Sequence, residues 1–196
     1  MTLSELITEV YTLTKRPDLV DSTASGIRAA TLKMHQVDFW YKDLVETGIA
    51  FGTSEYFQQL IYRSLFPFWR AAKYLRKYDA VGQTAGKFLE LVAPKQVVDG
   101  SGLSREDIFY IAGAELDIRS STSEQYFLLG YYANPDITDT GYNSWIALDH
   151  PYAIIYEAAS RVFKGMGKDD EAAQFKSDVN EQIAMLTTDS VQPEGY

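Results

Sequence analysis

The chain contains two histidines. Because histidine is a common catalytic and metal-binding residue, these two are considered first. His35 and His150 do not stand in the spacing of a metal-ligand motif. His150 precedes Pro151 at an expected helix start, which favours a structural role. His35 lies beside the apolar stripe of an expected helix, which favours a partly buried or surface histidine. No Gly-x-Ser-x-Gly motif occurs, so a nucleophile elbow is not expected.

One glycine-rich stretch comes close to a phosphate-binding loop. Residues 82–87 run GQTAGK, one residue short of the P-loop spacing, and Phe88 stands where the Mg²⁺-binding hydroxyl would be. We therefore expect a turn between strands here.

Paired carboxylates are the remaining candidate, because two of them suffice for glycoside hydrolysis. Glu115 and Asp117 lie two apart on an expected strand, a pattern typical of the solvated face of a half-buried strand. The acidic run 169–171 is typical of a helix N-terminus. We therefore expect no catalytic residue, no cofactor and no metal site. The enzyme alternative is a cell-wall (peptidoglycan) hydrolase that uses a carboxylate such as Glu115 or Glu157.

Composition narrows the class of protein further. The 196 residues include no Cys, which excludes disulfides, thiolate metal sites and cysteine nucleophiles. The start MTLSELITEVYTL lacks a basic region, so we expect no signal peptide. No apolar run reaches the roughly 18 residues of a membrane span, and we expect a soluble protein of intracellular origin. A net charge of −9 argues against a general nucleic-acid binder.

Positive charge is concentrated in one segment. Residues 63–78 contain five Lys or Arg and no acid. This basic, aromatic segment is compatible with a nucleic-acid stripe or with a subunit interface, since Arg, Tyr and Trp are enriched at interface hot spots. In an acidic chain we favour the interface. The residues that carry this hypothesis are Arg63, Trp69, Arg70, Tyr74 and Arg76.

Helical periodicity marks both ends of the chain. Thr2-x-x-Glu5 is a capping box and predicts a helix over 3–14, and a second helix begins near Ser22 to complete a helical hairpin. Asp149 is the expected cap of a later helix that has Pro in its first turn and ends at glycine. The acidic run 169–171 predicts the start of the final helix.

The middle of the chain is expected to be β-rich. The predicted strands are 44–51, 58–65, 88–92, 108–112, 115–119 and 126–132. IFYIA and ELDIR are separated only by Gly113 and Ala114, which predicts a hairpin. The segment FPFWRAAKYLRKYD fits either a strand or a helix, and its periodicity does not decide.

These elements predict an α+β protein, a small helical bundle from the N- and C-terminal helices with a β-rich inserted lobe. The expected parts are an N-terminal helical hairpin (1–40), the β-rich insertion (41–145), the C-terminal helices that complete the bundle (146–187) and a flexible tail (188–196). The two helices over 149–186 at first suggest a partner surface. If they close the bundle, much of their apolar stripe is core instead.

The order of several segments is similar to that of one protein family. They are FPFWRAAKYLRKYD, KFLELVAP, FYIAGAELDIRSS, YFLLGYYANPDIT, SWIALDHPYAIIYEAASRVFKGMG and the closing DDEAAQFK. The fifth, followed by an acidic helix start, is the most specific. Together they resemble the head-to-tail adaptor proteins of tailed bacteriophages, also called connector or head completion proteins, over nearly the whole chain.

The resemblance implies a structural virion protein without enzyme activity. Such adaptors form a ring, usually of twelve copies, that connects the portal to the tail and helps retain packaged DNA. Expected partners are other copies of the chain, the portal protein and a tail or nozzle protein, with DNA only as cargo passing through the channel and no membrane. The expected location is the neck of the virion, after assembly in the host cytoplasm. The resemblance also implies that FPFWRAAKYLRKYD is a strand.

The same resemblance adds the C-terminal tail to the expected interface. Family members often dock this segment into the portal, so Val191, Pro193 and Tyr196 join the candidate contact residues, with ordering of the tail on binding. The remaining alternative is a small partner-binding scaffold protein that uses the C-terminal helices without forming a ring.

Overall fold

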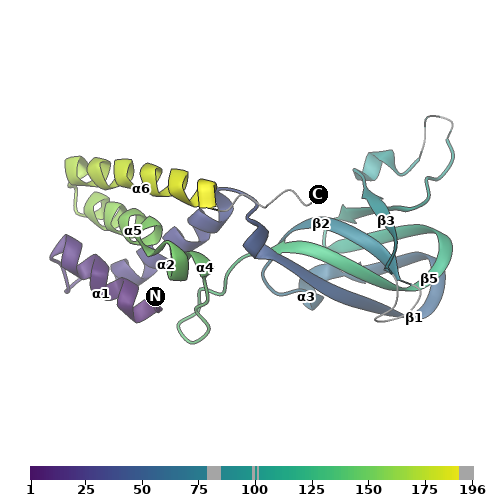
Figure 1. Ribbon diagram of the computed structural model, residues 1–196, viewed down its shortest axis with the longest axis horizontal. Helices are drawn as coiled ribbons and strands as arrows, with labels where there is room; N and C mark the ends of the chain where they lie inside the picture. The colour runs from purple at the N-terminus through teal and green to yellow at the C-terminus, as the bar shows by residue number, and fades with distance from the viewer. Residues whose placement is uncertain (79–84, 99, 101, 190–196) are drawn as a thin grey trace. The chain divides into compact units, whose positions relative to one another are not determined.

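The chain folds into two compact units in the computed structural model, which describes residues 1–78, 85–98, 100 and 102–189 (Figure 1). The helical unit comprises 1–43 together with the described residues from 134 onward, and the barrel unit comprises 44–133. Each unit has a hydrophobic core of its own.

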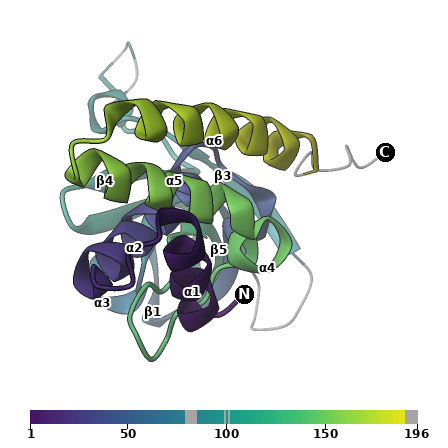
Figure 2. The ribbon, with the colours of Figure 1, turned by 90° about the vertical axis from the view of Figure 1, so that its left-hand side faces the viewer.

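Five α-helices build the helical unit. They are α1 (Leu3–Thr14), α2 (Val20–Gln36), α4 (Trp145–Asp149), α5 (Pro151–Gly165) and α6 (Asp169–Asp189), with the short 3-10 helix η1 (Tyr41–Asp43) before the barrel. Helix α5 is central and packs against α1, α2, α4 and α6 (Figure 2). It buries Ala153, Ile154, Ile155, Ala158, Ala159, Val162 and Phe163. Most of the apolar residues of α5 are therefore core of this unit.

The helix boundaries test the start signals found in the sequence. The capping box of α1 is confirmed, because the Thr2 and Glu5 side chains each accept from the other's backbone N–H. The expected Asp149 cap is wrong. Asp149 ends α4 and pairs with Lys42 at 2.6 Å, while α5 begins directly at Pro151. Because the short helix α4 ends at Asp149, the N-cap position of α5 is His150 and not Asp149.

Five strands build the barrel unit. They are β1 (Leu44–Ile61), β2 (Trp69–Tyr78), β3 (Ala85–Leu91), β4 (Ile108–Ala112) and β5 (Glu115–Ala133), with the short helices α3 (Tyr62–Leu65) and η2 (Pro94–Gln96) between them. Their order is β1-β5-β2-β3-β4, and β4 also pairs with β5, so the sheet closes on itself. The first part of β5 pairs with β4 and the second part with β2. With these two parts counted separately, six strand segments form a closed barrel.

The expected fold class is wrong, and α+β holds only loosely. The strands are not a lobe inserted in a helical bundle but a closed barrel around its own core. The prediction divided long strands at irregular residues: 44–51 and 58–61 are one strand, β1, and 115–119 and 126–132 are one strand, β5. The β1–β5 register shifts between Ala50 and Phe57, so the pairing is irregular there. Strands of this length can bend and pair at both ends, which closes a barrel.

Several local predictions in the β-rich region are confirmed. Strand β4 has the expected bounds, and the hairpin to β5 turns at Gly113 with φ of 67°. Residues 69–78 of FPFWRAAKYLRKYD form a strand. Residues 62–65 form a helix where a strand was expected. Residues 82–84 of the GQTAGK stretch lie outside the described residues, and residues 85–87 belong to β3.

One glycine allows close packing in the barrel wall. Gly130 on β5 lies opposite Tyr74 on β2. A Cβ atom at position 130 would come within 2.5 Å of the Tyr74 ring. Glycine is therefore required for the ring to lie across β5, and the Tyr74 hydroxyl donates to Glu46 on β1.

Candidate functional site

A serine, a histidine and an aspartate form a chain of hydrogen bonds in the helical unit. Nε2 of His35 lies 2.9 Å from Oγ of Ser144, and Nδ1 lies 2.7 Å from Oδ1 of Asp43. This order of groups is that of a serine-hydrolase triad, in which histidine activates the serine. It was missed in the sequence because the serine lies 109 residues from the histidine, and no local motif accompanies it.

Burial prevents this group from acting as a nucleophilic centre. Ser144 is only 4% exposed and His35 only 1%. Oγ of Ser144 also accepts from the N–H of Ala147 as the cap of α4, and Asp43 accepts from the indole of Trp145 at 2.7 Å. A nucleophile has to reach its substrate. We therefore interpret these residues as a buried hydrogen-bond network that connects α2, η1 and the start of α4.

The carboxylates proposed for a hydrolase do not form a catalytic pair. Glu115 accepts from Gln59 at 2.9 Å on the barrel unit. Asp117 shares its face of β5 but is 4% exposed, so the prediction of a solvated face is wrong there. Tyr110, the β4 neighbour of Asp117, packs against a small apolar cluster of Val92, Val97 and Ile108.

Glu157 is held by cations from three helices. Lys33 lies 2.7 Å from its carboxylate, Lys176 2.9 Å and Arg161 3.0 Å. Burial alone would raise the pKa of Glu157, but hydrogen bonds from Lys33 and Lys176 hold it below its ordinary value. A general acid in a glycosidase needs a raised pKa. The surroundings of Glu157 therefore favour a fixed negative charge.

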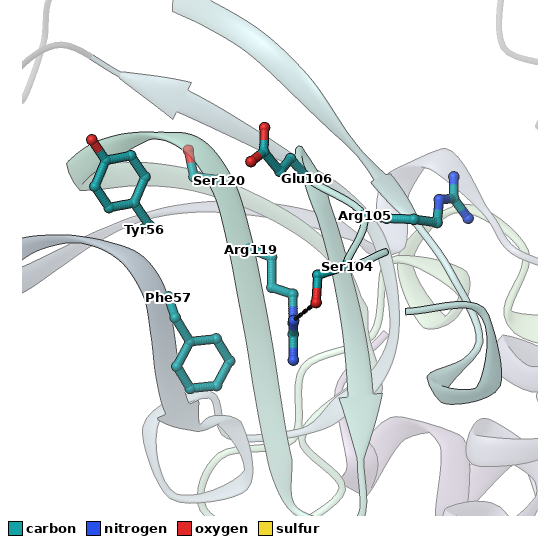
Figure 3. Close-up of a pocket in the computed structure, with 7 residues that line it drawn as sticks. All are labelled: Tyr56, Phe57, Ser104, Arg105, Glu106, Arg119 and Ser120. Atoms are coloured by element: carbon teal, nitrogen blue, oxygen red, sulfur yellow. Dashed lines mark hydrogen bonds between the residues drawn. The ribbon is translucent and has the colours of Figure 1, made fainter. Parts of the chain in front are cut away.

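A pocket of about 310 Å³ opens on the barrel unit, between β1, β5 and the loop before β4 (Figure 3). Its lining residues are Tyr56, Phe57, Ser104, Arg105, Glu106, Arg119 and Ser120. The Arg119 guanidinium lies 5.6 Å from the centre of the Phe57 ring, and one terminal nitrogen donates to Ser104 at 3.1 Å. Its Nε is buried and has no partner among the described residues.

The contents of this pocket favour binding over catalysis. Tyr56 and Phe57 are 64% and 47% exposed, and the Phe57 ring lies beside the Arg119 guanidinium. Exposed aromatics with arginine are typical of protein contacts. The sequence prediction missed both rings because it placed residues 52–57 between strands.

The candidate interface residues have distinct surroundings on the barrel unit. Trp69 stacks on Tyr131 with ring centres 4.9 Å apart, and the Arg76 guanidinium lies over Phe88 at 5.2 Å. Arg63 is exposed and Arg70 half-buried. Tyr74 packs over Gly130, as described above. Val191, Pro193 and Tyr196 lie outside the described residues. The role of these side chains as contacts stays a prediction.

The comparisons with known proteins add no relative. Neither a known family model nor any curated protein sequence matches this chain. Within the described part of the chain, no helix is long and apolar enough to cross a membrane. The same residues contain no group of three or more His, Cys, Asp or Glu that could hold a metal ion.

Charge is divided unequally between the two units. Residues 1–43 and 134–196 together contain 9 Lys and Arg against 17 Asp and Glu, whereas residues 44–133 contain 9 against 10. Lys77 is 6% exposed and bound to Asp107, so it adds no surface charge to the basic segment. The remaining basic side chains of that segment lie on the nearly neutral barrel unit.

Proposed function

We propose that this chain is a structural, non-enzymatic protein that assembles with copies of itself into a ring and serves as a head-to-tail adaptor of a tailed bacteriophage. In this role it joins the portal protein to a tail protein in the neck of the virion and helps to retain packaged DNA. The resemblance described above motivates the role. The unequal charge of the two units supports the mode of assembly.

The charge division is the observation that carries the proposal. A ring made by head-to-tail contacts needs two different, complementary surfaces on every copy. The basic segment with Arg70 and Arg76, on the barrel unit, is one such surface. The helical unit, with its excess of eight negative charges from 9 basic and 17 acidic residues, is the other. Complementary charge speeds encounter and sets the register of an interface.

The residues that could have supported hydrolysis, Ser144 and Glu157, do not favour the enzyme alternative. Ser144 is buried, and Glu157 is held ionised by three cations. A peptidoglycan zymogram on the purified protein tests the enzyme alternative directly. A clear lysis band would favour the hydrolase, and its absence is the expected result.

Charge reversal on β2 tests ring assembly. The double variant Arg70→Glu, Arg76→Glu should prevent ring formation on the portal, as seen by electron micrographs of the mixed proteins. Phage particles carrying it should lose their DNA. Lys95→Glu, also on the barrel unit but in η2, is the control and should assemble normally. Circular dichroism verifies that each variant is folded. Intact, infectious particles from the folded double variant would contradict the proposal.

A further inference from the structure

The cations around Glu157 are more numerous than this carboxylate can neutralise. Lys33 comes from α2, Arg161 from α5 and Lys176 from α6, and all three contact the same buried side chain. Three positive charges face one negative charge. This excess occurs in the unit that is otherwise strongly acidic, with 17 acids against 9 bases. The cluster is therefore a local positive site in a negative surrounding.

A pocket lies directly on this cluster. It has a volume of about 520 Å³ between α5 and α6. The lining residues are Glu157, Ser160, Arg161, Lys164, Asp169, Ala172, Ala173 and Lys176. Lys164 adds a further cation and Asp169 one carboxylate. Because Glu157 is 4% exposed, it forms the floor of the site while the cations reach outward.

The cations keep hydrogen-bond donors for a further partner. Arg161 uses Nε to bind Glu157, and its two terminal nitrogens have no acceptor among the residues described. Arg161 and Lys176 are 44% and 46% exposed at the side chain, so both side chains are partly open to solvent. Burial lowers the pKa of Lys33, the hydrogen bond to Glu157 opposes this, and nearby Lys176 lowers it further. Crowding of like charges is what an added anion relieves.

We propose that this pocket is a binding site for a phosphate-type oxyanion, either inorganic phosphate or the phosphate group of a small phosphomonoester. Arg161 and Lys176 bind the oxyanion and Lys164 contributes from the rim, while the negative charge of Glu157, with which both cations pair, weakens their attraction for it. A planar guanidinium matches two phosphate oxygens at once, and a lysine adds a point charge. The inference is independent of the proposed adaptor function, because it uses only contacts within the helical unit.

A phosphate titration of the whole protein tests the site. Amide chemical shifts are followed by NMR at constant ionic strength, with chloride as the reference anion. Inorganic phosphate should give saturable shifts confined to 157–164, 169–176 and the surroundings of Lys33, with a dissociation constant on the order of 1 mM. Glycerol phosphate forms a second arm. Tighter binding than inorganic phosphate identifies a phosphomonoester ligand, and equal or weaker binding identifies phosphate itself.

Matched variants connect the shifts to the residues. Arg161→Gln and Lys176→Gln should each weaken phosphate binding about tenfold, since each removes a charge-assisted hydrogen bond. Lys168→Gln makes the same change in net charge and should have less than about a twofold effect, because Lys168 pairs with Glu171 and does not line the pocket. Equal weakening by all three would mean nonspecific attraction and would overturn the site.

Glu157→Gln keeps the proposal testable if the cation variants unfold. It removes the negative charge and retains all three cations, so phosphate binding should tighten about threefold or more, provided the helical content is unchanged. Weaker binding by the folded variant would overturn the proposal. Shifts of the wild-type protein that fail to saturate about tenfold above the expected dissociation constant would do the same.

Discussion

The buried side chain of Lys77 and its partner Asp107 each have several hydrogen-bond partners, and these contacts determine how substitutions change the stability of the barrel unit. Lys77 donates to Asp107 and to the hydroxyls of Ser121 and Thr122, at 3.2 Å and 3.1 Å for the last two. Burial alone would raise the pKa of Asp107, but hydrogen bonds from Lys77, the Ser121 amide and Lys87 hold it well below its ordinary value. The carboxylate is therefore a stabilising element of the barrel unit.

Asp107→Asn should destabilise the barrel unit by about 3–5 kcal/mol, because it leaves the buried Lys77 ammonium without its counter-charge. Native-state hydrogen exchange of the strand amides measures this for the barrel unit alone. Glu90→Gln is the control: Glu90 pairs with Arg105 but is 63% exposed, so a loss below about 1 kcal/mol is expected. Similar losses for both variants would contradict the prediction.

The buried hydrogen-bond network of Ser144, His35 and Asp43 predicts the effect of a second substitution on stability. Ser144→Ala removes the hydroxyl that bonds Nε2 of His35 and the amide of Ala147, and it should cost about 1–3 kcal/mol in the stability of the helical unit. Ser177→Ala, at an exposed position of α6, should change stability by less than about 0.5 kcal/mol. A fluorophosphonate probe should not label the wild-type protein. Stoichiometric labelling of Ser144 would show that the serine is a reactive nucleophile after all.

At the scale of elements, local signals were predictable and distant pairings were not. The capping box at Thr2 and the turn at Gly113 are encoded within a few residues, and both are confirmed. Closure of the barrel depends on β4 and β2 pairing with different parts of one strand, β5, which no local pattern reveals. The same limit hid the candidate sites, since Lys33 and Glu157 are 124 residues apart.

The packing of β2 on β5 predicts the effect of a single methyl group. Gly130→Ala places a Cβ within 2.5 Å of the Tyr74 ring and should destabilise the barrel unit by about 1–3 kcal/mol. Gly48→Ala on β1, where a Cβ meets nothing within 4 Å, should be neutral or slightly stabilising. Adding Tyr74→Ala should suppress much of the Gly130→Ala loss, as measured by a double-mutant cycle. Strict additivity of the two changes would argue against the contact.

At the scale of the whole molecule, each unit contains a largely buried ionised carboxylate that links its stability to pH. Glu157 serves the helical unit and Asp107 the barrel unit, and both have a pKa below the ordinary values of 4.5 and 3.8. A lowered folded-state pKa means that the stabilisation is fully present above the ordinary value. It is lost as the pH falls through the folded-state pKa.

Acid should therefore weaken the two units in an order set by these groups. The helical unit is expected to lose stability below about pH 4.5 and the barrel unit below about pH 3.8. Glu157→Gln should flatten the pH dependence of the helical unit only, and Asp107→Asn that of the barrel unit only. Hydrogen exchange at several pH values separates the two. A flatter profile in the wrong unit would contradict this assignment.

The division of the helical unit across the chain has a consequence during synthesis on the ribosome. Helices α1 and α2 bury apolar side chains such as Leu6 and Ile27 against α5, which is translated only after the whole barrel unit. The barrel unit is continuous in sequence and has its own core, so it can fold while α5 is still missing. The N-terminal hairpin therefore waits with its apolar face uncovered. Translation speed through the barrel segment sets the length of that aggregation-prone interval.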